Sequence, residues 1–429
     1  MEGGNDSLLT RYTNSFDIDV LSVSFHPTEP RLATGSRTDP AKIWMFSPDN
    51  LKCIPVRQIL ARPVGSSYGQ INSVSFNSDG KFLATSSNQE CDARIWSMSN
   101  MTDVTTLTVN SPVRPPLSCI AFGQYGYLVT SYLDSTVGLW QFSDVSNMAV
   151  CHAILLGHTN YVISLTFHPT LYNIFASGSF DNTAKIWSIL PNGINAICVA
   201  TLSGHADCVA SVAFHPHPTI SLLATGSYDR TAKLWQCSPD YSSVNYIATL
   251  TGHTDFVLSV AFHPTLPLLA TGSRDMTAKL WRFLQDGARA SCVETITYNK
   301  FQKVRSLSFH PMLPVLAICH DGANSVTLYD CTNIPPYYDK YKKDMESINK
   351  LKLYKVAIPL ARKLFTQPQN TGSVSEGPLD DNRGLLIDRM TTNLVPKKGG
   401  SKWAKTRVKT RYRKRSRTRC KSRSKSKTR

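Results

Sequence analysis

One phrase recurs seven times along this sequence, and it restricts the possible folds more than any other feature. Its clearest copy contains Gly252-His253, Phe262-His263-Pro264, Thr271-Gly272-Ser273 and Trp281. The copies end at Trp44, Trp96, Trp140, Trp187, Trp235, Trp281 and Tyr329, at spacings of 52, 44, 47, 48, 46 and 48 residues. A unit of this size cannot bury its own apolar faces, so several copies must stack into one body.

Each copy contains four short segments with strand-like patterns. In the sixth copy, Val257–Phe262 alternates apolar and polar residues, Leu268–Ser273 forms the next strand, and 277–281 returns after a tight turn. A fourth strand precedes the next Gly-His pair, as at 246–250. Four strands in each period, close to the ~40–45 residues of a propeller blade, predict an all-β fold: a seven-bladed β-propeller.

Residues 8–333 resemble the WD40 repeat family, most closely in the fourth, fifth and sixth copies. The resemblance implies a buried hydrogen-bond chain that joins the Gly-His histidine, the Asp of the tight turn, a strand hydroxyl and the Trp indole. On this sequence the sets are His158, Asp181 and Trp187; His205, Asp229 and Trp235; and His253, Asp275 and Trp281. The hydroxyl member is Ser177 or Ser179, Thr225 or Ser227, and Thr271 or Ser273.

The other four copies depart from the family pattern. Their histidine position holds Phe16, Ser67, Val113 and Lys300, and no Trp in the chain is followed by Asp. A buried carboxylate or imidazole is tolerated only when its donors and acceptors are matched. We therefore expect these blades to depend on apolar packing more than on a polar network.

Closure of the ring requires a strand from the opposite end of the chain. Residues 8–12 precede the first copy and are favoured as the outer strand of the seventh blade. The alternative is the segment 350–356, which alternates partly and is also compatible with a helix starting at Tyr341 and ending before Pro359.

Charge divides the chain sharply. Residues 397–429 contain 17 Lys and Arg and no acidic residue, which leaves 30 basic against 30 acidic residues in 1–396. We therefore expect a propeller over 1–333, a linker or rim-packing segment that is partly ordered over 334–396, and a tail over 397–429. Strong self-repulsion and few apolar residues predict that the basic tail is disordered.

The tail predicts binding to a polyanion, nuclear import, or both. The residues expected to act are Lys402, Lys405, Arg411, Arg413, Lys414, Arg415, Arg417 and Arg419. Basic segments of this kind contact phosphates without reading sequence, so RNA or DNA is the expected partner. A solvated tail with no specific partner is the alternative.

Composition also bears on the compartment. The 11 cysteines are scattered and include no Cys-x-x-Cys pair, a pattern that favours reduced intracellular thiols over a disulfide framework or a zinc site. Neither a secretory signal nor a membrane-spanning apolar run is expected from the sequence. The expected location is intracellular, with the nucleus or nucleolus favoured and the cytoplasm as the alternative.

Two apparent chemical motifs conflict with the repeat pattern. Gly65-Ser66-Ser67-Tyr68-Gly69 matches a nucleophile elbow, but no helix follows it, so a flexible connector is the better interpretation. His205, Cys208, His215 and His217 have metal-like spacing, but His205 and His215 fall at opposite ends of one predicted strand. We expect no catalytic residues, no metal, no cofactor and no small-molecule substrate, and therefore no enzyme.

A face of the propeller is the stronger candidate for function. In the WD40 family the loops bearing Gly-His and the tight turn form one rim of the channel, where partners often dock. The turn positions on that rim are Arg37, Leu133, Phe180, Tyr228 and Arg274. Aromatic and Arg side chains commonly anchor interfaces, although these five are equally compatible with ordinary loop residues.

These patterns predict a non-enzymatic protein-interaction scaffold with a basic tail for nucleic-acid binding or nuclear import. One alternative is a substrate receptor of a cullin-type ubiquitin ligase, a role that usually requires a Trp-Asp-x-Arg motif, which these repeats lack. A hydrolase built on a propeller is an alternative of another class, and no set of residues supports it.

Overall fold

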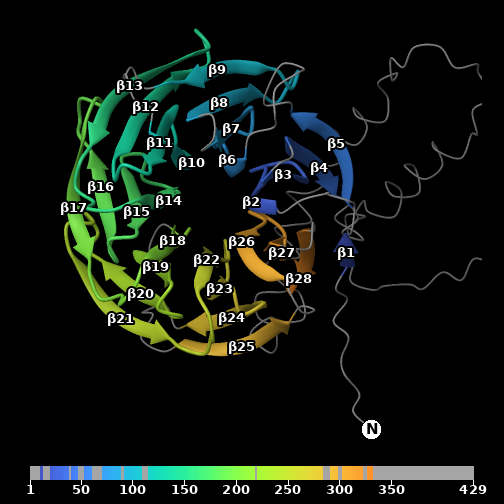
Figure 1. Cartoon of the computed structure of the whole chain (residues 1–429), viewed down its shortest axis with the longest axis vertical. Helices are drawn as coiled ribbons and strands as arrows, with labels where there is room; N and C mark the ends of the chain where they lie inside the picture. The colour runs from blue at the N-terminus through green and yellow to red at the C-terminus, as the bar shows by residue number, and fades with distance from the viewer. Residues whose placement is uncertain are drawn as a thin grey trace, which may run out of the picture. The chain divides into compact units, whose positions relative to one another are not determined.

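Four-stranded antiparallel sheets account for nearly all of the structure (Figure 1). The computed structural model describes residues 10–12, 20–37, 40–46, 53–59, 70–87, 91–108, 115–217, 220–283, 290–297, 302–321 and 326–331. Seven sheets lie around a central channel, with the first strand of each blade innermost. The predicted seven-bladed β-propeller is confirmed.

The strands of the first four blades follow the chain from the channel outwards. Blade 1 contains β2 (Val20–Phe25), β3 (Arg31–Ser36), β4 (Ala41–Phe46) and β5 (Cys53–Ile59). Blade 2 contains β6 (Ile71–Phe76), β7 (Phe82–Ser87), β8 (Asp92–Ser97) and β9 (Asp103–Leu107). Blade 3 contains β10 (Leu117–Phe122), β11 (Tyr127–Tyr132), β12 (Val137–Ser143) and β13 (Met148–Leu155). Blade 4 contains β14 (Val162–Phe167), β15 (Ile174–Ser179), β16 (Ala184–Ile189) and β17 (Ala196–Leu202).

Blades 5 and 6 repeat this order, whereas blade 7 is completed from the N-terminal side. Blade 5 contains β18 (Val209–Phe214), β19 (Leu222–Ser227), β20 (Ala232–Cys237) and β21 (Val244–Leu250). Blade 6 contains β22 (Val257–Phe262), β23 (Leu268–Ser273), β24 (Thr277–Phe283) and β25 (Ala290–Thr297). Blade 7 contains β26 (Lys303–Phe309), β27 (Val315–Asp321), β28 (Val326–Asp330) and β1 (Thr10–Tyr12).

The pairing of β1 with β28 closes the ring. The register joins Thr10 to Leu328 and Tyr12 to Val326 in antiparallel fashion. The expectation that the N-terminal strand completes the last blade is confirmed. The rival segment 350–356, the predicted 334–396 segment and the basic tail all lie outside the described residues.

Burial falls from the second strand of a blade to its outer strand. Every residue of β19 is buried, whereas β21 of the same blade exposes Asn245 and Tyr246. The inner strands are covered on both faces because neighbouring blades pack against them. The approach is close at Gly226, where an added Cβ would lie 2.9 Å from side-chain atoms of Val257 and Val260 in the next blade. A small residue is therefore required there.

The recurring His-Pro turns connect neighbouring blades. In blade 6 the Nδ1 atom of His263 accepts hydrogen bonds from the backbone N–H groups of Thr265 and Leu266, at 3.2 and 3.0 Å. Its ring packs edge-on against Phe309 of blade 7, with ring centroids 4.9 Å apart. The turn histidine therefore both shapes its turn and contacts the adjacent blade.

Other blades repeat this contact. The corresponding pairs are His26 with Phe76, His168 with Phe214, His215 with Phe262, and His310 with Phe25. No helix in the described part of the chain is long and apolar enough to cross a membrane.

Candidate docking face at the channel mouth

One end of the propeller carries the Gly-His loops and the tight turns between the second and third strands of each blade. In blade 5 a hydrogen-bond chain joins the two. His205 Nδ1 lies 2.7 Å from Asp229 Oδ2, and His205 Nε2 lies 2.7 Å from Thr225 Oγ1. The Trp235 indole N–H donates to Thr225 Oγ1 at 2.9 Å. The four groups form a buried chain of hydrogen bonds that connects the loop, the turn and the third strand.

Blades 4 and 6 contain the same four-membered chain. The hydroxyl is supplied by Ser177 in blade 4 and by Thr271 in blade 6, with all heavy-atom distances between 2.7 and 2.8 Å. The alternative hydroxyls, Ser179 and Ser273, donate instead to backbone carbonyl oxygens of the Gly-His loops. Both candidate hydroxyls are thus used, each in a different bond.

The direction of donation in these chains follows from the chemistry of their ends. An indole N–H can only donate, and an ionised carboxylate can only accept. The hydroxyl therefore accepts from Trp and donates to Nε2, while Nδ1–H donates to Asp. A neutral imidazole satisfies every bond, so the chain is complete without a buried cation.

The pKa values of these groups agree with that arrangement. Burial lowers the pKa of His158 and outweighs the opposing hydrogen bond to Asp181. Burial alone would raise the pKa of Asp181, Asp229 and Asp275, but the hydrogen bonds that each carboxylate accepts lower it instead. The carboxylates remain ionised and the His158 ring neutral near pH 7.

A backbone hydrogen bond holds the residue before the Asp of each of these turns at the mouth of the channel. In blade 5 the Tyr228 N–H donates to the carbonyl oxygen of Cys208 at 3.0 Å. Leu133, Phe180 and Arg274 make the equivalent bond to their own loops, at 2.9 Å in each case. In blades 4 to 6 this bond and the His–Asp bond together fix the turn against the Gly-His loop on both sides of the side chain.

Aromatic side chains from neighbouring blades meet at this face. Phe180 packs edge-on against Tyr228, with centroids 5.7 Å apart, and Tyr228 stacks on Phe256 at 4.3 Å with the ring planes 6° apart. Tyr161 packs against Phe180 at 6.0 Å, and the Arg274 guanidinium lies 5.3 Å from the Phe256 ring centre. We call these five residues, together with Arg305, the mouth cluster.

Arg305 completes the cluster from blade 7. Burial raises the pKa of Tyr228, while the nearby positive charge of Arg305 opposes that increase. Tyr228 thus packs against Phe180 of blade 4 and Phe256 of blade 6, and it lines the same cavity as Arg305 of blade 7. The side chain of a single turn therefore joins three blades and lies near a fourth.

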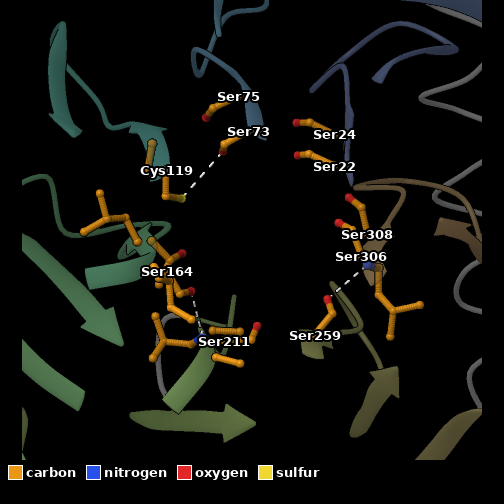
Figure 2. A pocket seen from close by; sticks show the side chains of 18 of the residues that line it. Ser22, Ser24, Ser73, Ser75, Cys119, Ser164, Ser211, Ser259, Ser306 and Ser308 are labelled. Atoms are coloured by element: carbon orange, nitrogen blue, oxygen red, sulfur yellow. Dashed lines mark hydrogen bonds between the residues drawn. The ribbon is translucent and has the colours of Figure 1, made fainter. Parts of the chain in front are cut away.

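Below the mouth cluster, the channel encloses a cavity of about 690 Å³. Hydroxyl groups of the innermost strands line it, as Figure 2 shows, and several of them join neighbouring blades. Ser211 Oγ accepts from the Val260 N–H and Ser259 Oγ from the Leu307 N–H, both at 3.0 Å. Ser22, Ser75 and Ser164 accept equivalent bonds from the following blade.

The wall formed by blades 1 and 7 differs from the rest of the channel. Ser24, Ser306 and Ser308 point into the cavity in Figure 2, and their hydroxyl groups form no hydrogen bond within the described part of the chain. Donors are therefore free on the side of the channel from which Arg305 arises.

Comparison with known proteins agrees with the repeat pattern. The family model "WD domain, G-beta repeat" matches residues 59–97, 149–188, 196–236 and 244–282. WD40 repeats thus occur at four places in this seven-bladed β-propeller. It is also 27% identical over 137 residues to "Protein HIRA" of Dictyostelium discoideum. That match covers 29% of this chain and 12% of the relative, so this chain spans a small part of the relative's length.

WD40 propellers generally act as non-catalytic scaffolds for protein interactions. In this WD40 propeller the structure brings Phe180, Tyr228 and Arg274 together through Phe256. Arg37 is exposed and Leu133 half-buried in the corresponding turns of blades 1 and 3, and no described contact joins either to the mouth cluster. The predicted tail residues lie outside the described residues.

Three members of the mouth cluster were missed in the sequence. Tyr161 and Phe256 each stand three residues after a Gly-His histidine, so the repeat pattern alone could have identified them. Arg305 lies four residues before Phe309 on the inner strand of blade 7, where blade 6 has Leu258. Arg305 comes close to Tyr228 only because the propeller closes into a ring, so no local sequence pattern indicates that the two residues are neighbours.

The metal-like spacing near His205 does not produce a site in the WD40 fold. His205 is committed to Asp229 and Thr225, whereas His215 packs on Phe262 at the far end of the strand. Within the described ranges no group of three or more His, Cys, Asp or Glu residues could hold a metal ion.

Proposed function

We propose that this WD40 propeller is a non-enzymatic scaffold that docks a protein partner on the mouth cluster. We further propose that residues 397–429 bind nucleic acid without sequence preference, direct nuclear import, or do both. The observation that carries the first proposal is the convergence of Phe180, Phe256 and Arg305 on Tyr228 at an exposed face.

The composition and rigidity of the mouth cluster suit a protein interface. Tyr161 is 47% exposed and Phe180 is 36% exposed, although large apolar side chains are usually buried. Aromatic and Arg side chains supply most interface anchors. Stacking holds the rings in place before any partner arrives, so docking would lose little side-chain entropy.

The proposal for the tail is supported by charge alone. All of the chain's net charge of +17 resides in its last 33 residues. If the tail makes six to ten phosphate contacts, its affinity for nucleic acid should fall about 10³–10⁵-fold when salt rises from roughly 50 to 200 mM. The proposed location is inside the cell, with the nucleus or nucleolus favoured over the cytoplasm.

Affinity capture from nuclease-treated cell lysate tests the docking face. Full-length protein is compared with the Phe180→Ala/Tyr228→Ala/Arg274→Ala variant. The matched control is Tyr125→Ala/Tyr172→Ala, which removes an exposed aromatic pair, 5.3 Å between centroids, at the opposite end of the blades. A partner lost only in the triple variant supports the proposal. Equal recovery by all three proteins contradicts it.

A tail-neutral variant tests the second proposal. In this full-length protein the 17 Lys and Arg residues of 397–429 are replaced by Gln. Binding of single-stranded RNA and of duplex DNA is measured by fluorescence anisotropy at two salt concentrations. The salt-dependent binding of the natural chain should disappear in the variant, together with nuclear accumulation of a fluorescent fusion. Retention of both would contradict a role for the tail.

A further inference from the structure

The described lining of the channel contains one charged side chain. Among the described residues that line the cavity, Arg305 is the only Lys, Arg, His, Asp or Glu. It is the third residue of β26 and, counted back from the strand phenylalanine, aligns with the second residue of the inner strand in the other blades. The corresponding lining positions of the other blades are uncharged: Leu21, Asn72, Ser118, Ile163, Ala210 and Leu258.

The described side chains that line the cavity beside Arg305 offer donors and no carboxylate. Ser306 and Ser308 follow it on β26, and Ser24 faces the same part of the cavity from blade 1 (Figure 2). These hydroxyls form no hydrogen bond within the described part of the chain. A guanidinium presents five N–H donors in a planar fork that matches a carboxylate.

The rings beside Arg305 favour an apolar contact over base stacking. The Tyr228 ring is stacked on Phe256, and the Arg274 guanidinium lies over Phe256 in turn. A nucleobase needs a free ring face to stack, and the faces of Tyr228 and Phe256 that stack on each other are already in use, as is the Phe256 ring beside Arg274. The exposed part of Phe180 still provides apolar surface next to the channel.

We propose that the mouth of the channel binds an acidic side chain of a partner protein, its carboxylate paired with Arg305 and a neighbouring apolar residue packed on Phe180. This inference rests on the proposed docking function and specifies the chemistry of the docked segment. The ion pair forms at the entrance of a partly enclosed cavity, where it is screened less than on open surface. A basic side chain would meet the charge of Arg305 and is excluded.

Panning of a displayed library of short random peptides tests this inference. The full-length tail-neutral variant serves as bait, because the natural tail would itself capture acidic peptides. The enriched peptides should carry Asp or Glu next to an aliphatic or aromatic residue. Their affinities are then measured by fluorescence anisotropy on the same bait.

Three further substitutions in that bait identify the residues responsible. Arg305→Gln should lower the affinity for the enriched peptides by ~tenfold or more, as expected when one member of a partly desolvated charge pair is removed. Arg305→Lys should retain part of the affinity, since the charge persists without the planar fork. Arg230→Gln is the matched control: it removes an exposed positive charge from the same face, outside the mouth cluster, and should change affinity less than twofold.

The outcomes separate this inference from the docking function beneath it. Peptides that require Phe180 and Tyr228 but show no acidic preference, or ignore Arg305→Gln, overturn the inference and leave the docking function standing. Failure of every peptide to depend on Phe180 or Tyr228 overturns both. Displacement of the peptides by a uridine-rich RNA oligonucleotide, in an Arg305-dependent manner, assigns the mouth to nucleic acid and overturns the inference.

Discussion

Blades 4, 5 and 6 and blades 1, 2 and 3 have the same four-stranded arrangement but different polar interiors. In the first group a histidine and an aspartate extend the Trp-to-hydroxyl bond to the loop and the turn. In the second group the Trp indole still donates to a strand threonine: Trp44 to Thr34, Trp96 to Thr85, and Trp140 to Thr130, at 2.9 to 3.0 Å. The inner half of the hydrogen-bond chain, from the Trp indole to the strand hydroxyl, is common to both groups.

Blade 3 shows how the outer half can be replaced. The Tyr132 hydroxyl accepts a hydrogen bond from Thr130 at 3.1 Å, so it takes the place that an imidazole holds in blades 4 to 6. Tyr132 is buried, and burial raises the pKa of its hydroxyl. The Tyr132 phenol ends this hydrogen-bond chain without a carboxylate, so the hydrogen-bond chain of blade 3 needs no buried charge. The comparison indicates that packing around Trp defines a blade, while the His–Asp extension fixes its loops.

Removal of the Trp should have the largest effect, and a similar one in both groups. Trp235→Ala and Trp96→Ala should each lower the free energy of unfolding by about 3–5 kcal/mol, because each leaves a cavity between two blades. Urea denaturation followed by far-UV circular dichroism measures both. A loss in blade 5 more than twice that in blade 2 would show that the polar extension, rather than packing, dominates.

The second prediction concerns the pH dependence of stability, which the turn histidine of blade 6 should contribute and the turn asparagine of blade 2 should not. Burial lowers the pKa of His263 to about 3, and protonation would also turn Nδ1 into a donor facing the N–H groups of Thr265 and Leu266. The unfolded chain binds this proton near pH ~6.5. As the pH falls below that value, the unfolded state alone is protonated, and stability should decline by about 1.4 kcal/mol per pH unit for this residue.

His263→Asn removes that contribution, and Asn77 already occupies the equivalent place in blade 2. Between about pH 6.5 and 4 the variant should lose ~3 kcal/mol less stability than the natural chain. Urea denaturation at several pH values measures the two slopes. Identical slopes would mean that His263 is protonated in the folded state.

The third prediction concerns the bonds that Asp229 makes to the Gly-His loop, to His205 and to the Ala206 N–H. Asp229 and Asp134 hold their turns alike, since Oδ1 of each accepts from a threonine two residues on, at 2.6 Å from the hydroxyl. Only Asp229 also bonds a histidine. Asp229→Ala should therefore destabilise the protein by ~1–3 kcal/mol more than Asp134→Ala, because it leaves His205 buried without its partner. Equal losses in urea denaturation would show that the bond to His205 contributes nothing.

The smallest effect concerns the turns themselves. Arg230 follows Asp229 with φ of 70°, in the left-handed region, where blade 4 has Asn182 with φ of 68°. Asparagine tolerates this conformation better than arginine. Arg230→Asn should raise the free energy of unfolding by ~0.5 kcal/mol. A change of zero or of opposite sign would mean that the Arg230 side chain makes a stabilising contact that offsets the backbone preference.

The sequence predicted the strands better than the contacts between blades. The Trp spacing identified seven blades, and residues 10–12 close the ring as expected. The pattern left Thr271 and Ser273 as equal candidates for the bond to Trp281, since residues two apart on a strand share a face. The register decides: Trp281 lies opposite Leu269, which brings the indole within reach of Thr271.

The docking face was only partly predictable for a similar reason. Phe180, Tyr228 and Arg274 share one position in the repeat, so a local pattern found them. Arg305 reaches Tyr228 across the intervening blade 6, and that distance is set by the closed ring rather than by any segment of chain.

The pairing of β1 with β28 also has a consequence for biosynthesis. Thr10 pairs with Leu328, so more than 300 residues must be translated after the first strand leaves the ribosome before its partner exists. At about 5–20 residues per second this takes roughly 15 to 60 s. During that interval the outer edge of the last blade does not yet exist and β1 has no sheet to join. A chain truncated before residue 326 would leave β1 permanently unpaired, and its propeller ring would stay open.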